Sequence, residues 1–270
     1  MTDTVTCEVL YLDHDSELPV SIMTGTGDGT FESRGSYSIR SVQIGNARHL
    51  EPAADVETNG FSMCKHVSAV ADFYDDDEVR NVYYPEVTAL LRAELNASEV
   101  VVFDHNTRAE LRAPGRPDAA REPVHLVHND FTARSGAERV HRELGTSSAE
   151  RLLQGRLSII NVWRPITGPL ESKPLAVCDA QSLTTDDLIA ADMVYEHRTG
   201  SEYRATFSPA HRWYYYPGLN VDELLLIKVC DTDEGAVSRF CLHTSFDHPD
   251  TTPASRPRES IELRVMVFYL

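Results

Sequence analysis

Hydrophobic and polar positions alternate along much of this chain, which is typical of strands with one buried face. Near the N-terminus the alternation covers TCEVLYL (residues 6–12) and YSIRSVQI (residues 37–44). In the second half, short apolar or aromatic runs are separated by Pro, Gly, Asp and Asn: RLSIINVWRPI, PLAVCDAQSL, RATFSP, HRWYYYP, ELLLIKVCD, RFCLHTSF and SIELRVMVFYL. Short strands at regular spacing predict an all-β core of the sandwich or jelly-roll type.

Four segments instead predict helices beside this core, which makes the fold class α+β. DDDEVRNVYYPEVTALLRAEL starts with acidic residues that suit a helix N-terminus, and apolar residues recur at helical spacing around Pro85. TARSGAERVHRELG and SSAERLLQG predict two short helices over residues 132–145 and 147–155. TTDDLIAADMVYE (residues 184–196) predicts a further helix with Thr184 or Thr185 as its N-cap. Between them, SEVVVFDHNTR predicts a buried strand.

Length and composition limit the organisation and the partners. With 270 residues, of which 41% are hydrophobic, we expect a single domain over residues 1–270, in which about 1–95 pack on a core of about 96–270. A net charge of −17 argues against nucleic acid. Without a membrane-length apolar run, and with five scattered cysteines, we expect reduced thiols in a cytoplasmic monomer or homodimer. The glycine-rich TGTGDGTF runs into a strand-like segment, which favours a turn over a phosphate loop.

The segment VHNDFT carries the first candidate chemistry. His128 and Asp130 are two positions apart, so in a strand both side chains point to one face. Joined by a histidine from another strand, they form a 2-His-1-carboxylate triad, which leaves open positions on Fe(II). His243 in RFCLHTSFDHP is the candidate for that third ligand. The structural alternative is an ordinary polar pair at a strand end.

Two other histidines compete with this set and are less suitable. The second H-x-D motif, at His248 and Asp250, contains Pro249 and has no histidine after it, which favours a surface turn. His125 is three positions before His128 and would point to the other face of a strand, where a structural role is expected.

A third signal follows His243 in RPRESIELR. Arg258 and Ser260 share one face of a predicted strand, and a guanidinium beside a hydroxyl can bind the distal carboxylate of 2-oxoglutarate. Glu262 and Arg264 continue that face, so a structural salt-bridge ladder is the alternative for the stretch. Arg264 is the second candidate for the cosubstrate clamp.

Several blocks, in a fixed order, resemble one family. They are VVVFDHNTR, VHNDFT, GRLSIINVWRPITGPLESKPLAVCDAQSL, DLI, HRWYYYPGLNVDELLLIKVCDT, HTSFDHP and RPRESIELRVMVF, and they cover roughly residues 95–270. The family includes a cephamycin cephem-methoxylation component and fungal tailoring oxygenases that form endoperoxides or aziridines. The resemblance implies a double-stranded β-helix (a cupin-like jelly roll), non-haem Fe(II) and 2-oxoglutarate as cosubstrate. By motif position it points to His128, Asp130 and His243 as catalytic iron ligands.

The same blocks contain further candidates for binding roles. Asn161 and Arg164 lie among apolar residues, where each needs a partner. For Asn161 we weigh a 2-oxoglutarate contact, and for Arg164 a substrate contact, each against a structural hydrogen bond. Arg108 is a candidate for a substrate carboxylate, with a structural ion pair as the alternative. Trp213 and Tyr215 are candidates for an apolar wall of the substrate pocket, with core packing as the alternative.

We therefore predict a dioxygenase that uses Fe(II), 2-oxoglutarate and O₂ to hydroxylate, desaturate or cyclise a small natural-product intermediate or amino-acid derivative in secondary metabolism. Two other functions stay open at the level of the sequence. One is a cupin-like hydrolase or isomerase with Zn²⁺ or Mn²⁺ at the same triad. The other is a non-catalytic β-sandwich binding protein.

Overall fold

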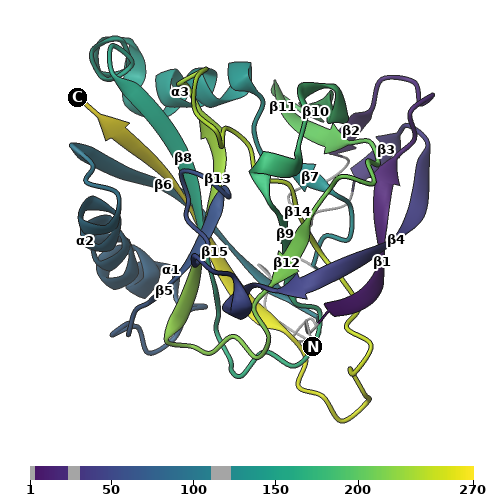
Figure 1. Ribbon diagram of the computed structural model, residues 1–270. Coiled ribbons are helices and arrows are strands. Elements are labelled where there is room, and N and C mark those ends of the chain that lie inside the picture. The colour runs from purple at the N-terminus through teal and green to yellow at the C-terminus, as the bar shows by residue number, and fades with distance from the viewer. Residues whose placement is uncertain (1–3, 24–30, 111–122) are drawn as a thin grey trace.

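Two β-sheets face each other in the computed structural model, which describes residues 4–23, 31–110 and 123–270 (Figure 1). The five-stranded sheet has the order β5 (Phe61–Lys65), β13 (Glu223–Asp231), β8 (Arg156–Pro165), β15 (Glu259–Tyr269) and β6 (Glu99–Ala109). The ten-stranded sheet has the order β1 (Thr4–Leu12), β4 (Tyr37–Asn46), β12 (Trp213–Tyr215), β9 (Leu175–Cys178), β14 (His243–Ser245), β7 (His128–Asn129), β11 (Arg198–Ala205), β10 (Leu188–Tyr195), β2 (Val20–Met23) and β3 (Phe31–Arg34). The predicted jelly roll, with its flanking helices, is confirmed.

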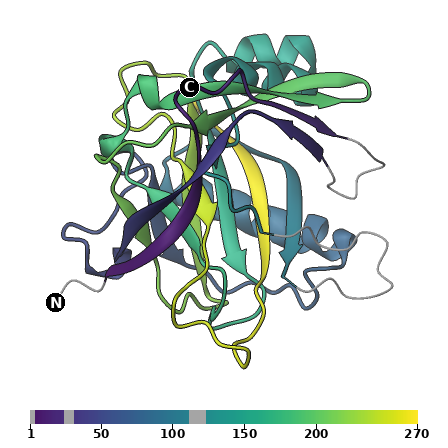
Figure 2. The same ribbon diagram turned by 90° about the vertical axis from the view of Figure 1, so that its right-hand side faces the viewer.

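The helices lie outside the two sheets. The short α1 (Asp76–Glu78), a π-helical turn (Val79–Tyr83) and α2 (Tyr84–Glu94) follow one another and pack on the outer face of the five-stranded sheet. The other helix, α3 (Ala133–Leu152), runs along one end of the sheets in both views (Figures 1 and 2). The two short helices expected at 132–145 and 147–155 form this single element, which is interrupted at Gly145 with φ 72°. Short 3-10 turns occupy Ala47–His49, Ala180–Ser182 and Thr185–Asp187.

The helix predicted over residues 184–196 is wrong. Thr184 does form a capping box with Asp187, but only one 3-10 turn follows. Residues Leu188–Tyr195 continue as β10 and pair with β11 in an antiparallel hairpin, from Leu188 opposite Ala205 to Tyr195 opposite Arg198. Tertiary pairing therefore overrides the helical preference of Leu, Ala and Met. The glycine-rich TGTGDGTF segment lies outside the described residues, apart from Phe31.

Strands β8 and β15 are buried on both faces, and their alternation separates two cores. Leu157, Ile159 and Trp163 point between the sheets, whereas Ile160 and Val162 point toward α2. In β15 the residues Ile261, Leu263, Val265 and Val267 point toward α2, whereas Met266 and Phe268 point between the sheets. Strands covered on both sides explain why these segments read as nearly continuous apolar runs.

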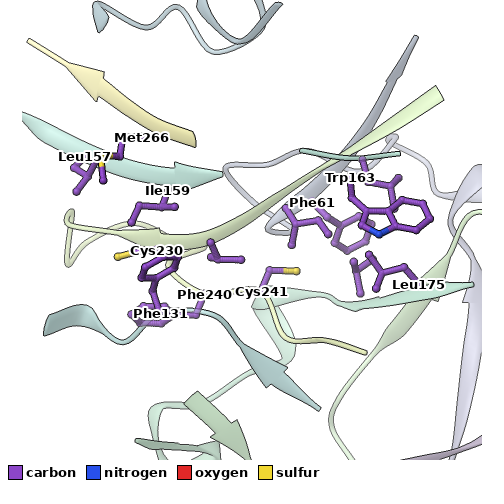
Figure 3. Packing of buried hydrophobic residues seen from close by; sticks show 14 of the residues in the cluster. Phe61, Phe131, Leu157, Ile159, Trp163, Leu175, Cys230, Phe240, Cys241 and Met266 are labelled. Carbon is purple, nitrogen blue, oxygen red and sulfur yellow. The ribbon is translucent and has the colours of Figure 1, made fainter. Parts of the chain in front are cut away.

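The space between the sheets is apolar at one end and polar at the other. Leu157, Ile159 and Met266 fill one end, and Trp163 with Leu175 lies toward the other (Figure 3). Because β8 and β15 are antiparallel, Asn161 lies opposite Arg264, and Trp163 lies opposite Glu262. Alternation places Ser260, Glu262 and Arg264 on the inward face of β15. Polar side chains are costly there unless they have partners, so this end is the place to look for a site.

The N-terminal third is built into both sheets. Its strands β1 and β4 pair with each other, and β4 pairs in parallel with β12. Its strand β5 pairs with β13 in the five-stranded sheet. Phe61 of β5 belongs to the same buried cluster as Trp163 and Val177.

We predict that Glu223 gives the fold a stability that depends on pH. Hydrogen bonds from Arg48 lower the pKa of Glu223 to about 2, although burial acts in the opposite direction. Because the folded-state pKa lies below the ordinary value of 4.5, this stabilisation is complete above about pH 4.5 and is lost as the pH falls toward about 2. Glu223→Gln should lower the free energy of unfolding by about 1–2 kcal/mol at neutral pH, as measured in urea.

The difference between Glu223→Gln and wild type should shrink as the pH is lowered through that window. Asp222→Asn is the matched control, because the Asp222 side chain is 42% exposed and its ion pair with Lys65 is on the surface. A difference that stays constant with pH would contradict the assignment.

Candidate metal centre

Strands β7 and β14 are neighbours, and this brings the two candidate histidines together. His128 lies directly opposite His243 in the antiparallel ladder, and their ring centroids are 4.5 Å apart. Asp130 follows β7 on the same face as His128. One ligand atom from each of the three residues lies within 4.8 Å of the other two. The triad selected from the sequence is therefore one cluster in space, and it faces the polar end of β8 and β15.

Backbone carbonyls fix the orientation of both imidazoles. His128 Nδ1 lies 2.7 Å from the Leu126 carbonyl, and His243 Nδ1 lies 3.1 Å from the Cys241 carbonyl. A carbonyl only accepts hydrogen bonds, so each Nδ1 carries a proton, and the neutral form of each ring has its lone pair on Nε2. Burial, and then the neighbouring His128, lower the pKa of His243 to about 4, so its ring stays neutral at neutral pH.

The carboxylate of Asp130 is held by one oxygen and leaves the other for a ligand. Asn161 donates from Nδ2 to Asp130 Oδ2 at 2.7 Å, and Arg264 donates from Nε to the same oxygen at 3.2 Å. Oδ1 lies 3.5 Å from His128 Nε2. Burial alone would raise the pKa of Asp130, but Arg264 and the two imidazoles outweigh it and hold that pKa well below its ordinary value. Two Nε2 atoms and one Oδ1 are therefore ready to bind a cation.

Arg258 immediately precedes β15 and is a buried cation that interacts electrostatically with Arg108 and Glu262. Its residue is 2% exposed, and its guanidinium lies over the Trp163 ring at 5.0 Å. It donates from Nε to Ser260 Oγ at 3.1 Å and from Nη1 to the Lys173 carbonyl at 2.9 Å. Among the described residues, no carboxylate forms an ion pair with this guanidinium. Burial, and then Arg108, lower the pKa of Arg258 to about 9, because its charge is not fully compensated.

Glu262 interacts electrostatically with Arg258 and also with Asp130 and His128 of the triad. Glu262 is 8% exposed, and its Oε1 lies 3.7 Å from Arg264 Nη2. Burial, and then Asp130, raise the pKa of Glu262. Arg108 on β6 lies opposite Ser260, on the inward face. The candidates Asn161, Arg108, Ser260, Arg258 and Arg264 are thus all gathered at the polar end.

Three other candidates lie elsewhere. Arg164 is on the opposite face of β8 from Asn161, where Phe73 and Tyr83 cover its guanidinium and the Val221 carbonyl accepts a hydrogen bond from it. Trp213 donates to Tyr11, and Tyr215 is bonded to His248, both in a separate cluster behind the ten-stranded sheet. These positions place all three away from the triad.

In the aromatic segment HRWYYYP, the residues that face inward were not among the candidates chosen from the sequence. Tyr214 and Tyr216 pack on the cluster between the sheets, and Trp163 belongs to it. Trp163 shares its face of β8 with Asn161, so strand alternation could have identified it. Asp104 was also missed. It sits at a bulge, where Arg264 lies opposite Asp104 but Val265 lies opposite Val102. Nothing in the sequence marks that bulge.

Comparison with known proteins gives the family. A family model described as "Oxidoreductase/YMDC permease-like domain" matches residues 9–268. The hydroxylase/desaturase CTB9 of Cercospora beticola is 33% identical, over 87% of this chain and 78% of that protein. The Fe(II)/2-oxoglutarate-dependent dioxygenase nvfI of Aspergillus novofumigatus is 31% identical, over 89% of this chain and 87% of that protein. The chain belongs to the Fe(II)/2-oxoglutarate-dependent oxygenase family.

A solved structure shows that this oxygenase shares the family fold. The iron and alpha-ketoglutarate-dependent endoperoxidase NvfI superposes with a TM-score of 0.87 at 27% identity, over 98% of each chain. The family resemblance seen in the order of the sequence motifs is confirmed. In the described part of the oxygenase, no helix is long and apolar enough to cross a bilayer.

Proposed function

We propose that this oxygenase binds Fe(II) through His128, Asp130 and His243, and oxidises a small organic substrate with 2-oxoglutarate and O₂. The observation that carries the proposal is the convergence of these three residues, each of which offers one ligand atom within 4.8 Å of the other two. Two imidazoles and one carboxylate match the donor set of non-haem Fe(II) sites that keep open positions.

Arg258 supports a site for 2-oxoglutarate next to the metal. A buried guanidinium without an ion-pair partner lowers stability unless a ligand supplies the missing anion. The distal carboxylate of 2-oxoglutarate is such an anion, and Ser260 Oγ, 3.1 Å from Arg258 Nε, lies beside it as a second polar contact. The guanidinium of Arg264 is already paired with Asp130 and Asp104, so we assign the clamp to Arg258.

The residues of the chain orient the reactants and exclude water. Bound Fe(II), with 2-oxoglutarate and O₂, supplies the oxidation of an unactivated C–H bond while 2-oxoglutarate is converted to succinate and CO₂. Asn161 and Arg264 hold Asp130, and the two backbone carbonyls hold the imidazoles. Leu157, Ile159 and Met266 fill the apolar end of the space between the sheets, and this packing excludes water from that side of the site.

The names of the relatives support a proposal for the substrate class. They include a hydroxylase/desaturase, an endoperoxidase and a protein of aspirochlorine biosynthesis. We propose that the substrate is a small natural-product intermediate or amino-acid derivative. Hydroxylation is the default reaction, and desaturation or ring closure results when the pocket holds the substrate so that hydroxylation of the oxidised carbon is slow. A hydrolase with the same triad would not require Arg258, a buried guanidinium without an ion pair to a carboxylate among the described residues. A non-catalytic binding protein would not require three converging metal-ligand atoms.

The organisation belongs to the same proposal. Both sheets include strands of the N-terminal third, which supports a single oxygenase domain over residues 1–270. We propose a cytoplasmic monomer or homodimer that works without nucleic acid, in keeping with the net charge of −17.

We predict that Fe(II) and 2-oxoglutarate together produce a visible charge-transfer band in the anaerobic wild-type protein. His128→Ala and His243→Ala should each abolish the band, because two remaining ligands do not hold the metal. His197→Ala is the matched control, since the His197 side chain is 86% exposed, and it should keep the band. Absence of the band in the wild type would remove the proposed function.

We predict that Arg258→Gln raises the Kd of 2-oxoglutarate by at least about 30-fold at saturating metal, because a buried charge-assisted contact is lost. The variant should bind the metal as wild type does. Its melting temperature without 2-oxoglutarate should not fall, because an uncompensated buried charge has been removed.

Arg256→Gln is the control for the arginine, since Arg256 is two positions earlier and exposed. It should leave the Kd of 2-oxoglutarate unchanged. A loss of stability in Arg258→Gln without a change in cosubstrate affinity would identify Arg258 as structural.

A further inference from the structure

Arg264 divides its guanidinium among three carboxylates. Nε lies 3.2 Å from Asp130 Oδ2, and Nη1 lies 3.5 Å from Asp104 Oδ2. Nη2 lies 3.7 Å from Glu262 Oε1. One cation therefore faces three anions, and a side chain shared in this way cannot turn toward one of them without leaving another. The three carboxylates fix the guanidinium of Arg264 in one orientation, in which Nε points at Asp130 Oδ2.

Asp104 is in turn held from α3. Arg139 donates from Nη2 to Asp104 Oδ2 at 3.1 Å, and its guanidinium covers the Phe103 ring at 4.7 Å. The bulge in β6 at this point sends both Phe103 and Asp104 toward the interior, where regular alternation would send only one. The bulge is thus what lets a single helix residue contact two successive residues of β6.

The same helix begins at Ala133, three residues after Asp130. Thr132 is its N-cap and forms a capping box with Ser135. Both residues are tied to β11, through Thr132 Oγ1 to Ser201 Oγ at 3.0 Å and Ser135 Oγ to the Ser201 carbonyl at 2.7 Å. The contacts form a closed circuit: Asp130 leads along the chain into α3, Arg139 on α3 binds Asp104, Asp104 binds Arg264, and Arg264 binds Asp130.

We propose that Arg264 is a positioning residue for the metal ligand Asp130, and that Arg139 on α3 supports it through Asp104. The inference rests on the proposed function for the identity of the metal, but it concerns the orientation of the carboxylate. With Oδ2 held by Arg264 and Asn161, the carboxylate presents Oδ1 to the cation and binds through one oxygen. Loss of Arg264 frees the carboxylate to rotate and leaves Asp130 and Glu262 as neighbouring buried anions without their shared cation.

The test uses Co²⁺, which is stable in air and whose visible spectrum reports ligand geometry, on metal-free full-length protein. Arg264→Gln should weaken Co²⁺ binding about 10- to 100-fold and change the spectrum of the bound ion, as expected for residues that orient a ligand. Arg264→Lys, which keeps the charge but not the three-way fork, should lie between Arg264→Gln and wild type.

Arg139→Gln tests the circuit from α3, and remains informative where Arg264→Gln does not fold. It should weaken Co²⁺ binding by about 2- to 30-fold. Arg134→Gln is the matched control, because Arg134 lies on the same helix with a side chain that is 71% exposed. It should bind Co²⁺ like wild type. Melting temperatures are recorded for each variant. A structural defect lowers the melting temperature and leaves the spectrum of the bound Co²⁺ unchanged, whereas a change at the ligand Asp130 alters that spectrum.

Two results would overturn the inference. One is wild-type Co²⁺ affinity and spectrum in Arg264→Gln and Arg139→Gln. The other is a normal Co²⁺ site in Arg264→Gln with a large rise in the Kd of 2-oxoglutarate, which would make Arg264 the cosubstrate clamp. Failure of the proposed function is a separate outcome, because the wild type would then bind Co²⁺ and show no Fe(II) and 2-oxoglutarate band.

Discussion

The carboxylate of Asp130 is a buried anion, and the rest of the site is arranged around keeping it ionised and aimed. In the interior of a protein such a group takes up a proton unless cations and hydrogen bonds compensate its charge. Here Arg264 and Asn161 bind Oδ2, and the two imidazoles lie on the other side. Those contacts require β8 and β15 to be antiparallel neighbours, with Asn161 opposite Arg264. The pairing of two strands in one sheet therefore sets the geometry of a ligand carried by the other sheet.

Arg258 immediately precedes β15 and Arg264 lies in the middle of that strand, and the two differ in their partners. The charge of Arg264 is shared among three carboxylates, and these raise its pKa even though burial acts in the opposite direction. Arg258 has a hydroxyl, a carbonyl and an aromatic ring, and burial lowers its pKa to about 9. A compensated arginine serves to hold other groups in place, whereas an uncompensated one is costly in the folded protein and supports a role in binding an anion.

Much of the fold and part of the site could be predicted from the sequence, because both depend on short-range spacing. The jelly-roll core follows from short runs with period 2, and the helix around Pro85 from its period and its acidic start. The proximity of His128 and Asp130 follows from strand alternation alone. The helix expected at 184–196 failed because its residues suit a helix, while its pairing with residues 198–205 forms a hairpin that local preference does not reveal.

The sequence by itself determined which residue types can carry the chemistry and in what order they occur: a histidine and a carboxylate two apart, a later histidine, and a later arginine. Tertiary structure alone decided which face of each strand points inward. Alternation along a strand defines two sets of side chains on opposite faces but does not say which set is buried. Contacts with strands distant in the sequence decide which face is buried. That choice sent Arg164, Trp213 and Tyr215 away from the triad and brought Trp163 to Arg258. It also brought Asp104 to Arg264, because the bulge in β6 appears only when that strand meets β15.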